Sequence, residues 1–256
     1  MKRKKQKITE NNFQITTSVI VLPLLFVLVM WLAFWIDLKY HFDFAQFGIY
    51  PRTIFGLVGI FCSPFLHGNL EHLYNNTIPI LVLMAALRLF YRNHSIAIIV
   101  LGIILSGLLT WVFARSSFHI GASGLIYVLA SFIFFKGLQT RYYRLVALSF
   151  LIVLLYGGMV WYIFPNVEQG ISWESHLAGL FVGLVFIKFF EVPKYQKQLK
   201  YDWQQPNFDA SQDKFMQRFD ENGNFVNLPP SEIEELKIEE PAILYRYEIV
   251  SKKLNY

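Results

Sequence analysis

The chain has 256 residues, of which 55% are hydrophobic and only 16% are charged, with a formal net charge of +5. A soluble domain of this length normally carries about 25% charged residues, so the composition excludes an ordinary soluble domain and indicates a membrane protein. No basic surface with interleaved aromatic residues occurs outside the ends of the apolar segments, which disfavours a nucleic-acid partner.

The acidic residues divide the chain into two regions. Only seven of the 18 acids precede Val192, and the other eleven lie between Asp202 and Glu248. We therefore expect residues 1–16 to form a basic N-terminal segment and residues 17–191 to form the membrane-embedded domain. Residues 192–256 then form a polar tail, whose role the sequence does not identify.

Six apolar segments are candidates for membrane spans, because a hydrocarbon core about 30 Å thick needs roughly 20 apolar residues per helix. The predicted spans are residues 17–36, 72–91, 95–114, 121–135, 142–164 and 173–190. A lone strand cannot satisfy its backbone in lipid, and the alternation typical of a β-barrel is absent. The fold class is therefore all-α, a polytopic bundle of six transmembrane helices. The fourth span is short, which favours a helix buried among the others.

A long loop separates the first two spans. The segment from Asp37 to Glu71 is too apolar for a solvated coil, and connections of this length usually contain structure of their own. We expect it to lie partly in the outer membrane interface. Arg52 is expected to hold it in place through lipid headgroups or backbone carbonyls.

Lysine and arginine residues predict the topology. They gather before the first span, at the junctions of spans two with three and four with five, and after the sixth. The positive-inside rule then places both termini in the cytoplasm. We expect a multi-pass protein of a bacterial inner membrane, with the first span retained as an anchor.

The second span begins with polar side chains. His72 and Asn76 are four residues apart, so they share a helix face and both can donate hydrogen bonds inward. His67 precedes them by five residues. A metal site at His67 and His72 is an alternative, but divalent ions usually need three or four ligands, so we expect neither metal nor cofactor. A plain polar helix start also fits this segment taken alone.

The fourth span begins with a serine between small residues. Gly121 and Gly124 flank Ser123 and allow unusual backbone angles and close approach. At a helix N-terminus, unpaired N–H groups favour negative charge beside the serine. Tyr127 lies one turn further along the same face, where its ring can pack on an imidazole. Alone, such a turn also fits simple helix packing.

The sixth span carries a histidine above a stripe of glycines. His176, Gly179 and Gly183 share one face, and the Gly-x-x-x-Gly spacing permits close approach of a neighbouring helix. If that neighbour is the fourth span, His176 reaches Ser123. A histidine satisfied inside the bundle is the alternative.

The predicted topology brings these three motifs to the same side of the membrane. Spans two, four and six cross the membrane in the same direction, so their first turns lie at one depth. Polar side chains in spans are costly and usually functional. A serine, a histidine and two hydrogen-bond donors at one depth are the components of an acyl-transfer site.

Over roughly residues 48–190 the chain resembles the rhomboid intramembrane serine proteases. The resemblance rests on the motif residues in order, namely His67, His72, Asn76, Gly121-Ala122-Ser123-Gly124, Tyr127, His176, Gly179 and Gly183. It implies a rhomboid-like bundle of six transmembrane helices, in which the serine and the last-span histidine form a catalytic dyad.

The resemblance also implies a role for each motif residue. Ser123 would be the nucleophile and His176 the general base. His72, Asn76 and the Ser123 amide would form the oxyanion hole, and Tyr127 would support His176. His67, Gly121, Gly124, Gly179 and Gly183 would be supporting residues.

The expected function is hydrolysis of peptide bonds in or near transmembrane segments. The partners would be transmembrane protein substrates and membrane lipids, reached through a polar cavity open to the outer side. The sequence does not determine the oligomeric state. The alternatives are a non-catalytic rhomboid-like membrane chaperone and a transporter. The transporter is disfavoured because no predicted span carries an ionisable group of the relay type in its central turns.

Overall fold

The computed structural model describes residues 15–165, 167, 170–191, 208–209, 211, 213, 215–220 and 222–226. Most of the predicted N-terminal segment and most of the predicted tail therefore lie outside the described residues. The chain divides into two compact units, residues 1–197 and residues 198–256.

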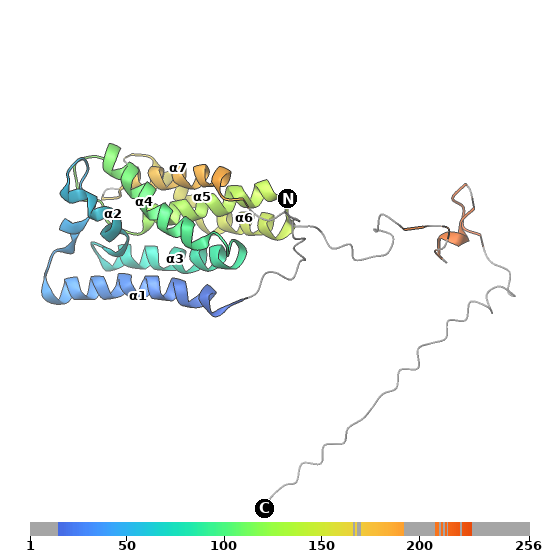
Figure 1. Cartoon of the computed structure of the whole chain (residues 1–256), viewed down its shortest axis with the longest axis horizontal. Coiled ribbons are helices and arrows are strands. Elements are labelled where there is room, and N and C mark those ends of the chain that lie inside the picture. The colour runs from blue at the N-terminus through green and yellow to red at the C-terminus, as the bar shows by residue number, and fades with distance from the viewer. Residues whose placement is uncertain are drawn as a thin grey trace, which may run out of the picture. The chain divides into compact units, whose positions relative to one another are not determined.

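The first unit is a bundle of long helices that lie side by side (Figure 1). The helices are α1 (Thr17–Tyr40), α3 (Leu70–Phe90), α4 (Ser95–Phe113), α5 (Ser123–Thr140), α6 (Tyr143–Tyr156) and α7 (Trp173–Phe189). Helix α1 packs on α3, and α5 packs on α3, α4, α6 and, most extensively, α7. These contacts place α5 at the centre of the bundle. Its first residue is Ser123, the candidate nucleophile.

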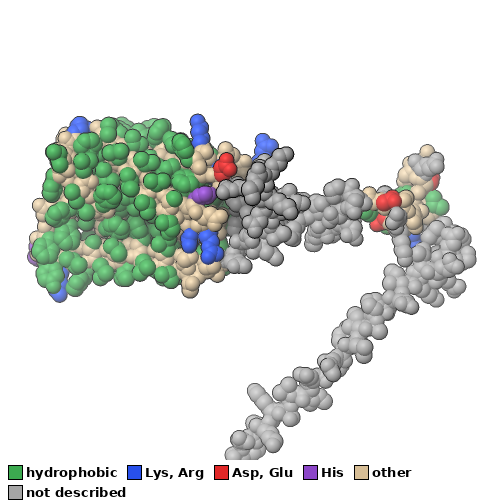
Figure 2. All heavy atoms as spheres, viewed as in Figure 1, with side chains coloured by type: hydrophobic (Ala, Val, Ile, Leu, Met, Phe, Trp, Pro, Cys, Tyr) green, Lys and Arg blue, Asp and Glu red, His purple; other side chains and the backbone are tan. Residues whose placement is uncertain are grey.

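The bundle has the size and surface of a membrane protein. Five described segments are long and apolar enough to cross a bilayer, and the sixth helix, α7, has 17 residues. Apolar side chains cover the sides of the bundle and charged side chains lie at its ends (Figure 2). The described residues form no strand beyond isolated bridges. The prediction of an all-α membrane bundle is confirmed.

The predicted end of the fourth span is wrong. Helix α5 continues to Thr140 instead of ending at Phe135, because the buried ammonium group of Lys136 donates hydrogen bonds to the Ile187 carbonyl and to Gln139. These bonds allow the helix to continue past a charge. Helix α5 is the most buried of the five candidate spans, as expected, and with 18 residues it is also the shortest of them.

The fifth span, predicted over residues 142–164, covers Tyr143–Ile163, but it is not one regular helix. Helix α6 ends at Tyr156, and the 3-10 helix η5 (Gly157–Ile163) completes the span. Two consecutive glycines, Gly157 and Gly158, explain the change, since glycine is among the poorest residues for a helix interior. This span is the least buried of the candidates.

The loop between α1 and α3 contains short helices, as predicted. They are η2 (Phe44–Phe47), η3 (Phe55–Leu57), α2 (Gly59–Cys62) and η4 (Ser63–Phe65). Arg52 donates hydrogen bonds to the carbonyls of Val112 and Ala114 at the end of α4. Of the two expected partners of Arg52, lipid headgroups or backbone carbonyls, the structure shows the carbonyls.

The described part of the second unit is small. It contains the 3-10 helix η8 (Met216–Arg218) and a bridge between Phe219 and Phe225. Between them, the Asp220 carboxylate accepts hydrogen bonds from the backbone of Asn222 and Asn224. These bonds lower the pKa of Asp220 and explain its place in the turn.

Candidate active site

The turn before Ser123 lies against the first turns of α3. Ser123 is the first residue of α5, and Gly121 before it has a φ of 108°, in the region that favours glycine. A Cβ on Gly121 would lie 2.6 Å from His72 Nε2 and 3.8 Å from Asn76 Nδ2. The glycine therefore allows these two side chains to approach the turn that carries Ser123.

The start of α3 holds His72 and Asn76 in place. The Asn69 side chain caps the helix by accepting a hydrogen bond from the His72 amide, at 2.7 Å. Asn76 is 3% exposed, and its amide donates one hydrogen to the His72 carbonyl at 2.8 Å. This bond fixes the Asn76 side chain beside the turn of His72.

His67 lies beside His72, with ring centroids 5.0 Å apart. Neither His67 nitrogen makes a hydrogen bond of good geometry with a described residue, although the Phe65 backbone lies close enough to oppose the pKa shift weakly. Burial, and then the nearby His72, lower the pKa of His67 to about 3. No three His, Cys, Asp or Glu side chains gather as a metal site in the described part of the chain.

Helix α7 approaches α5 at two glycines. A Cβ on Gly179 would overlap the Gly124 carbonyl oxygen and lie 2.9 Å from Tyr127 Cβ. A Cβ on Gly183 would overlap the Ser131 hydroxyl. The sequence left the neighbour of the glycine stripe open, with the fourth span as the case that brings His176 near Ser123, and the structure shows that this neighbour is α5.

His176 is fixed on two sides. The ring of Tyr127 stacks on the imidazole, with 4.4 Å between centroids and 17° between planes. The Tyr162 carbonyl oxygen lies 2.9 Å from His176 Nδ1, and the Tyr127 hydroxyl donates to the Met159 carbonyl. Both carbonyls belong to η5. His176 is 7% exposed, so its ring has one defined orientation.

Ser123 and His176 lie at the same level of facing helices. Ser123 directly precedes Gly124, and His176 lies one turn before Gly179, so both residues are next to the point where α5 and α7 approach most closely. Ser123 is partly exposed. No hydrogen bond joins the Ser123 hydroxyl to His176 within the described residues. The motif residues of the three helices are thus gathered at one end of the bundle.

Comparison with known proteins decides the family. The rhomboid domain model matches residues 55–191, which is more than half of the chain. The chain belongs to the rhomboid family. It is a multi-pass integral membrane protein, and rhomboids are usually intramembrane serine proteases.

The relatives of this rhomboid include mycobacterial proteins. Uncharacterised proteins of Mycobacterium bovis and Mycobacterium tuberculosis are each 34% identical to it over 155 residues, which cover 57% of this chain and 65% of theirs. An uncharacterised protein of Mycobacterium leprae is 34% identical over 146 residues, covering 54% of this chain and 58% of its own. The chain therefore spans less than two thirds of the length of these relatives.

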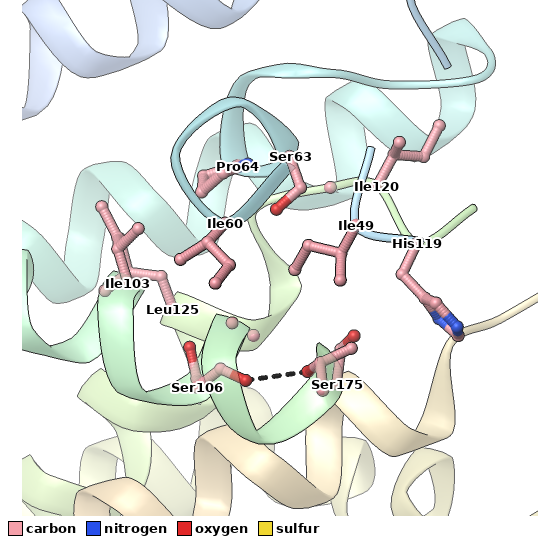
Figure 3. A pocket seen from close by; sticks show the side chains of 14 residues that line it. Ile49, Ile60, Ser63, Pro64, Ile103, Ser106, His119, Ile120, Leu125 and Ser175 are labelled. Atoms are coloured by element: carbon pink, nitrogen blue, oxygen red, sulfur yellow. Dashed lines mark hydrogen bonds between the residues drawn. The ribbon is translucent and has the colours of Figure 1, made fainter. Parts of the chain in front are cut away.

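A small cavity lies behind the serine turn of this rhomboid (Figure 3). Its volume is about 20 Å³, room for about one water molecule. Gly121 and Gly124 line it together with apolar side chains and with five polar ones, those of Ser63, Ser106, Thr110, His119 and Ser175. Neither Ser123 nor His176 lines it, so it differs from the predicted polar cavity around the dyad.

Sequence reasoning missed several polar residues of this rhomboid. Glu174, two residues before His176, is 2% exposed and forms an ion pair with Arg115 at 3.3 Å. The Arg115 amide also donates to Glu174. His119, four residues before Ser123, is 2% exposed and contacts Ser172. Proximity in sequence to the two candidate catalytic residues is the only signal that singles them out.

Proposed function

We propose that this rhomboid is an intramembrane serine endopeptidase, with Ser123 as nucleophile and His176 as general base. The observation that carries the proposal is the contact of His176 Nδ1 with the Tyr162 carbonyl. A carbonyl oxygen only accepts, so in the neutral ring Nδ1 carries the proton and Nε2 keeps its lone pair. Nε2 is then the nitrogen available to take the Ser123 proton.

The reaction begins with proton transfer from Ser123 to His176 as the hydroxyl oxygen attacks the carbonyl carbon of a substrate peptide bond. The tetrahedral oxyanion accepts hydrogen bonds from the Ser123 amide, His72 and Asn76. His176 then gives its proton to the leaving amine, and an acyl-enzyme remains on Ser123. Water, deprotonated by His176, attacks this ester, and His176 returns the proton to the Ser123 oxygen as the second product leaves.

The oxyanion donors have independent support. The amide of Ser123 lies at the start of α5, where N–H groups have no partner within the helix. His72 and Asn76 lie against Gly121, the second residue before Ser123. Removal of one such donor typically lowers kcat about 10²- to 10³-fold.

The proposed substrates are transmembrane segments of other proteins. Their carbonyls are hydrogen-bonded and shielded within a helix, so the segment must unwind locally before Ser123 can attack. Entry beside α6 is favoured because this span is the least buried of the candidate spans. Its continuation, η5, holds both His176 and Tyr127 through carbonyls.

The proposed orientation places the Ser123 end outside and both termini in the cytoplasm. Arg88 and Lys188 lie in the last turns of α3 and α7, and Lys136 lies four residues before the end of α5, in the half of the helix away from Ser123. This distribution agrees with the positive-inside rule. A reporter fused to either terminus should remain on the cytoplasmic side of a bacterial inner membrane, and an external location would contradict the proposal.

The test of the proposed activity uses the full chain in liposomes with a transmembrane reporter substrate. Native protein should cleave the reporter and react with a fluorophosphonate probe at Ser123. Ser123→Ala and His176→Ala should abolish both, and Asn76→Ala should lower kcat about 10²- to 10³-fold. Ser116→Ala, a change of an exposed serine, is the matched control. Cleavage by Ser123→Ala at the native rate would refute the proposal.

One observation favours a second candidate, a non-catalytic rhomboid-like membrane chaperone. The described residues provide no hydrogen bond between Ser123 and His176, and an unactivated serine would not hydrolyse peptides. Catalytic hydrogen bonds are often long in the absence of substrate, so this geometry is compatible with both candidates. Lack of probe labelling and of cleavage by folded native protein would favour the chaperone.

A further inference from the structure

His119 connects three segments beside the candidate active site. Its backbone exchanges two hydrogen bonds with Ile49 of the loop after α1, at 2.9 and 3.0 Å. Its ring Nδ1 contacts the Ser172 hydroxyl, and Nε2 lies 2.9 Å from the Arg115 carbonyl oxygen. Figure 3 shows Ile49 beside His119, on the segments that the bridge joins.

The protonation of the ring follows from these partners. The Arg115 carbonyl only accepts, so Nε2 carries a proton, and Ser117 lies 3.4 Å from the same nitrogen. Burial lowers the pKa of His119, so the ring is neutral near pH 7 and Nδ1 accepts from the Ser172 hydroxyl. Arg115 and Glu174 are the charged groups that act on the ring, in opposite directions.

The contacts continue from Ser172 to the serine turn. Because the Ser172 hydroxyl donates to His119, its oxygen accepts from the Ser175 hydroxyl, 2.8 Å away. Ser175 directly precedes His176. Its backbone carbonyl lies 3.5 Å from the position of a Cβ on Gly124, the residue after Ser123. The hydrogen-bonded path thus starts four residues before Ser123 and ends at Ser175, whose backbone lies beside Gly124.

We propose that His119 is a positioning residue, which sets the placement of His176 relative to Ser123 through Ser172 and Ser175. The inference rests on the proposed protease function and deepens it. His119 does not touch the reacting atoms. It holds the start of α7 against the segment that leads into α5, so that the imidazole and the hydroxyl meet in reactive geometry.

The test separates the two ring nitrogens with two substitutions. In His119→Asn the side-chain oxygen can replace Nδ1 and still accept from Ser172. In His119→Gln the longer amide can replace Nε2 and still donate to the Arg115 carbonyl, but the link to Ser172 is lost. Ser172→Ala removes the same link by deleting one hydroxyl, and Ser117→Ala is the matched control on the Nε2 side.

The measurements are kcat and KM for the liposome reporter, the rate of fluorophosphonate labelling per folded molecule, and the melting temperature. We expect His119→Gln and Ser172→Ala to lower kcat and labelling about 10- to 100-fold with KM nearly unchanged, since small misplacements of reacting groups have effects of this size. His119→Asn and Ser117→Ala should stay within about threefold of native in both rates. The double variant with His119→Gln and Ser172→Ala should be no slower than either single variant, because both break one path.

If Ser172→Ala keeps the native kcat and the native labelling rate, the inference is overturned. This variant deletes a single hydroxyl group, so the protein should still fold. Equal losses in His119→Asn and His119→Gln would also overturn it, because the path would then not run through Nδ1. A loss confined to melting temperature would show a purely structural role. The proposed protease function is tested separately, since it fails if folded native protein does not cleave the reporter or if Ser123→Ala cleaves it at the native rate.

Discussion

The phenol ring of Tyr127 lies nearly parallel to the imidazole of His176, with 4.4 Å between their centroids. Tyr127 is one helical turn after Ser123, so a single face of α5 presents both the hydroxyl and the ring that orients the base. Helix η5 fixes both rings: the Met159 carbonyl accepts a hydrogen bond from the Tyr127 hydroxyl, and the Tyr162 carbonyl accepts one from His176 Nδ1.

This relationship predicts different results for two substitutions of Tyr127. Tyr127→Phe keeps the stacked ring and loses only the hydrogen bond to Met159, so kcat should fall by less than about tenfold. Tyr127→Ala frees the imidazole to rotate, and kcat should fall about 100-fold, in the range expected for a displaced catalytic group. Reporter cleavage in liposomes measures both. Equal activity of the two variants would contradict a role for the ring stack.

The α5–α7 crossing predicts that Gly179 tolerates no side chain. In Gly179→Ala the new Cβ would overlap the Gly124 carbonyl, so the helices must separate. Overpacking of this kind costs about 1–3 kcal/mol or more, and cleavage should fall with it. Thermal unfolding in detergent measures the loss. Gly158→Ala is the control, because a Cβ there meets nothing within 4 Å, and similar melting temperatures for both variants would refute the close contact.

The ion pair of Arg115 and Glu174 predicts a non-additive result. Arg115→Met leaves the buried Glu174 carboxylate without its counter-ion and should destabilise the protein. The loss should be smaller than the roughly 3–5 kcal/mol typical of a broken buried pair, because the Arg115 side chain is 47% exposed.

Glu174→Gln, introduced together with Arg115→Met, removes the unpaired charge and should restore most of the lost stability. Unfolding midpoints of the native protein, the two single variants and the double variant form the complete cycle. Additive losses would show that the two side chains do not interact.

His67 predicts a dependence of stability on pH. Its pKa is about 3 in the folded protein, against an ordinary value of 6.5, so the unfolded chain binds a proton first as pH falls. The stability that neutral His67 contributes is therefore present above pH 6.5 and is lost progressively between pH 6.5 and about 3. His67→Phe, which cannot titrate, should reduce the fall in melting temperature between pH 7.5 and 5. The matched change of an exposed histidine, His41→Gln, should leave that fall unchanged.

Local periodicity explains why the motif residues could be identified from the sequence. His72 with Asn76, Ser123 with Tyr127, and His176 with Gly179 each lie on one helix, where spacing alone determines the shared face. The family match over residues 55–191 and the helical bundle confirm the fold that these patterns predict. The roles assigned to the site residues stay predictions until the variants are measured.

The helix ends were harder to predict because they depend on distant partners. Lys136 extends α5 through a carbonyl of α7, 51 residues away. Composition alone suggested that the apolar segment ends before this charge. The end of α6 at Tyr156 could have been predicted from the Gly157-Gly158 pair that follows it. The continuous apolar character of the span favoured a single helix instead.

The length of the apolar segments and the helical spacing of the motif residues are properties of neighbouring residues. They were enough to predict the membrane bundle and which motif residues share a helix face. Only the tertiary structure decided which nitrogen of His176 is protonated, because the deciding carbonyl belongs to η5. The same holds for His119, whose hydroxyl partner is 53 residues away. Hydrogen bonds between segments depend on how helices pack in space, and no periodicity of the chain encodes that packing directly.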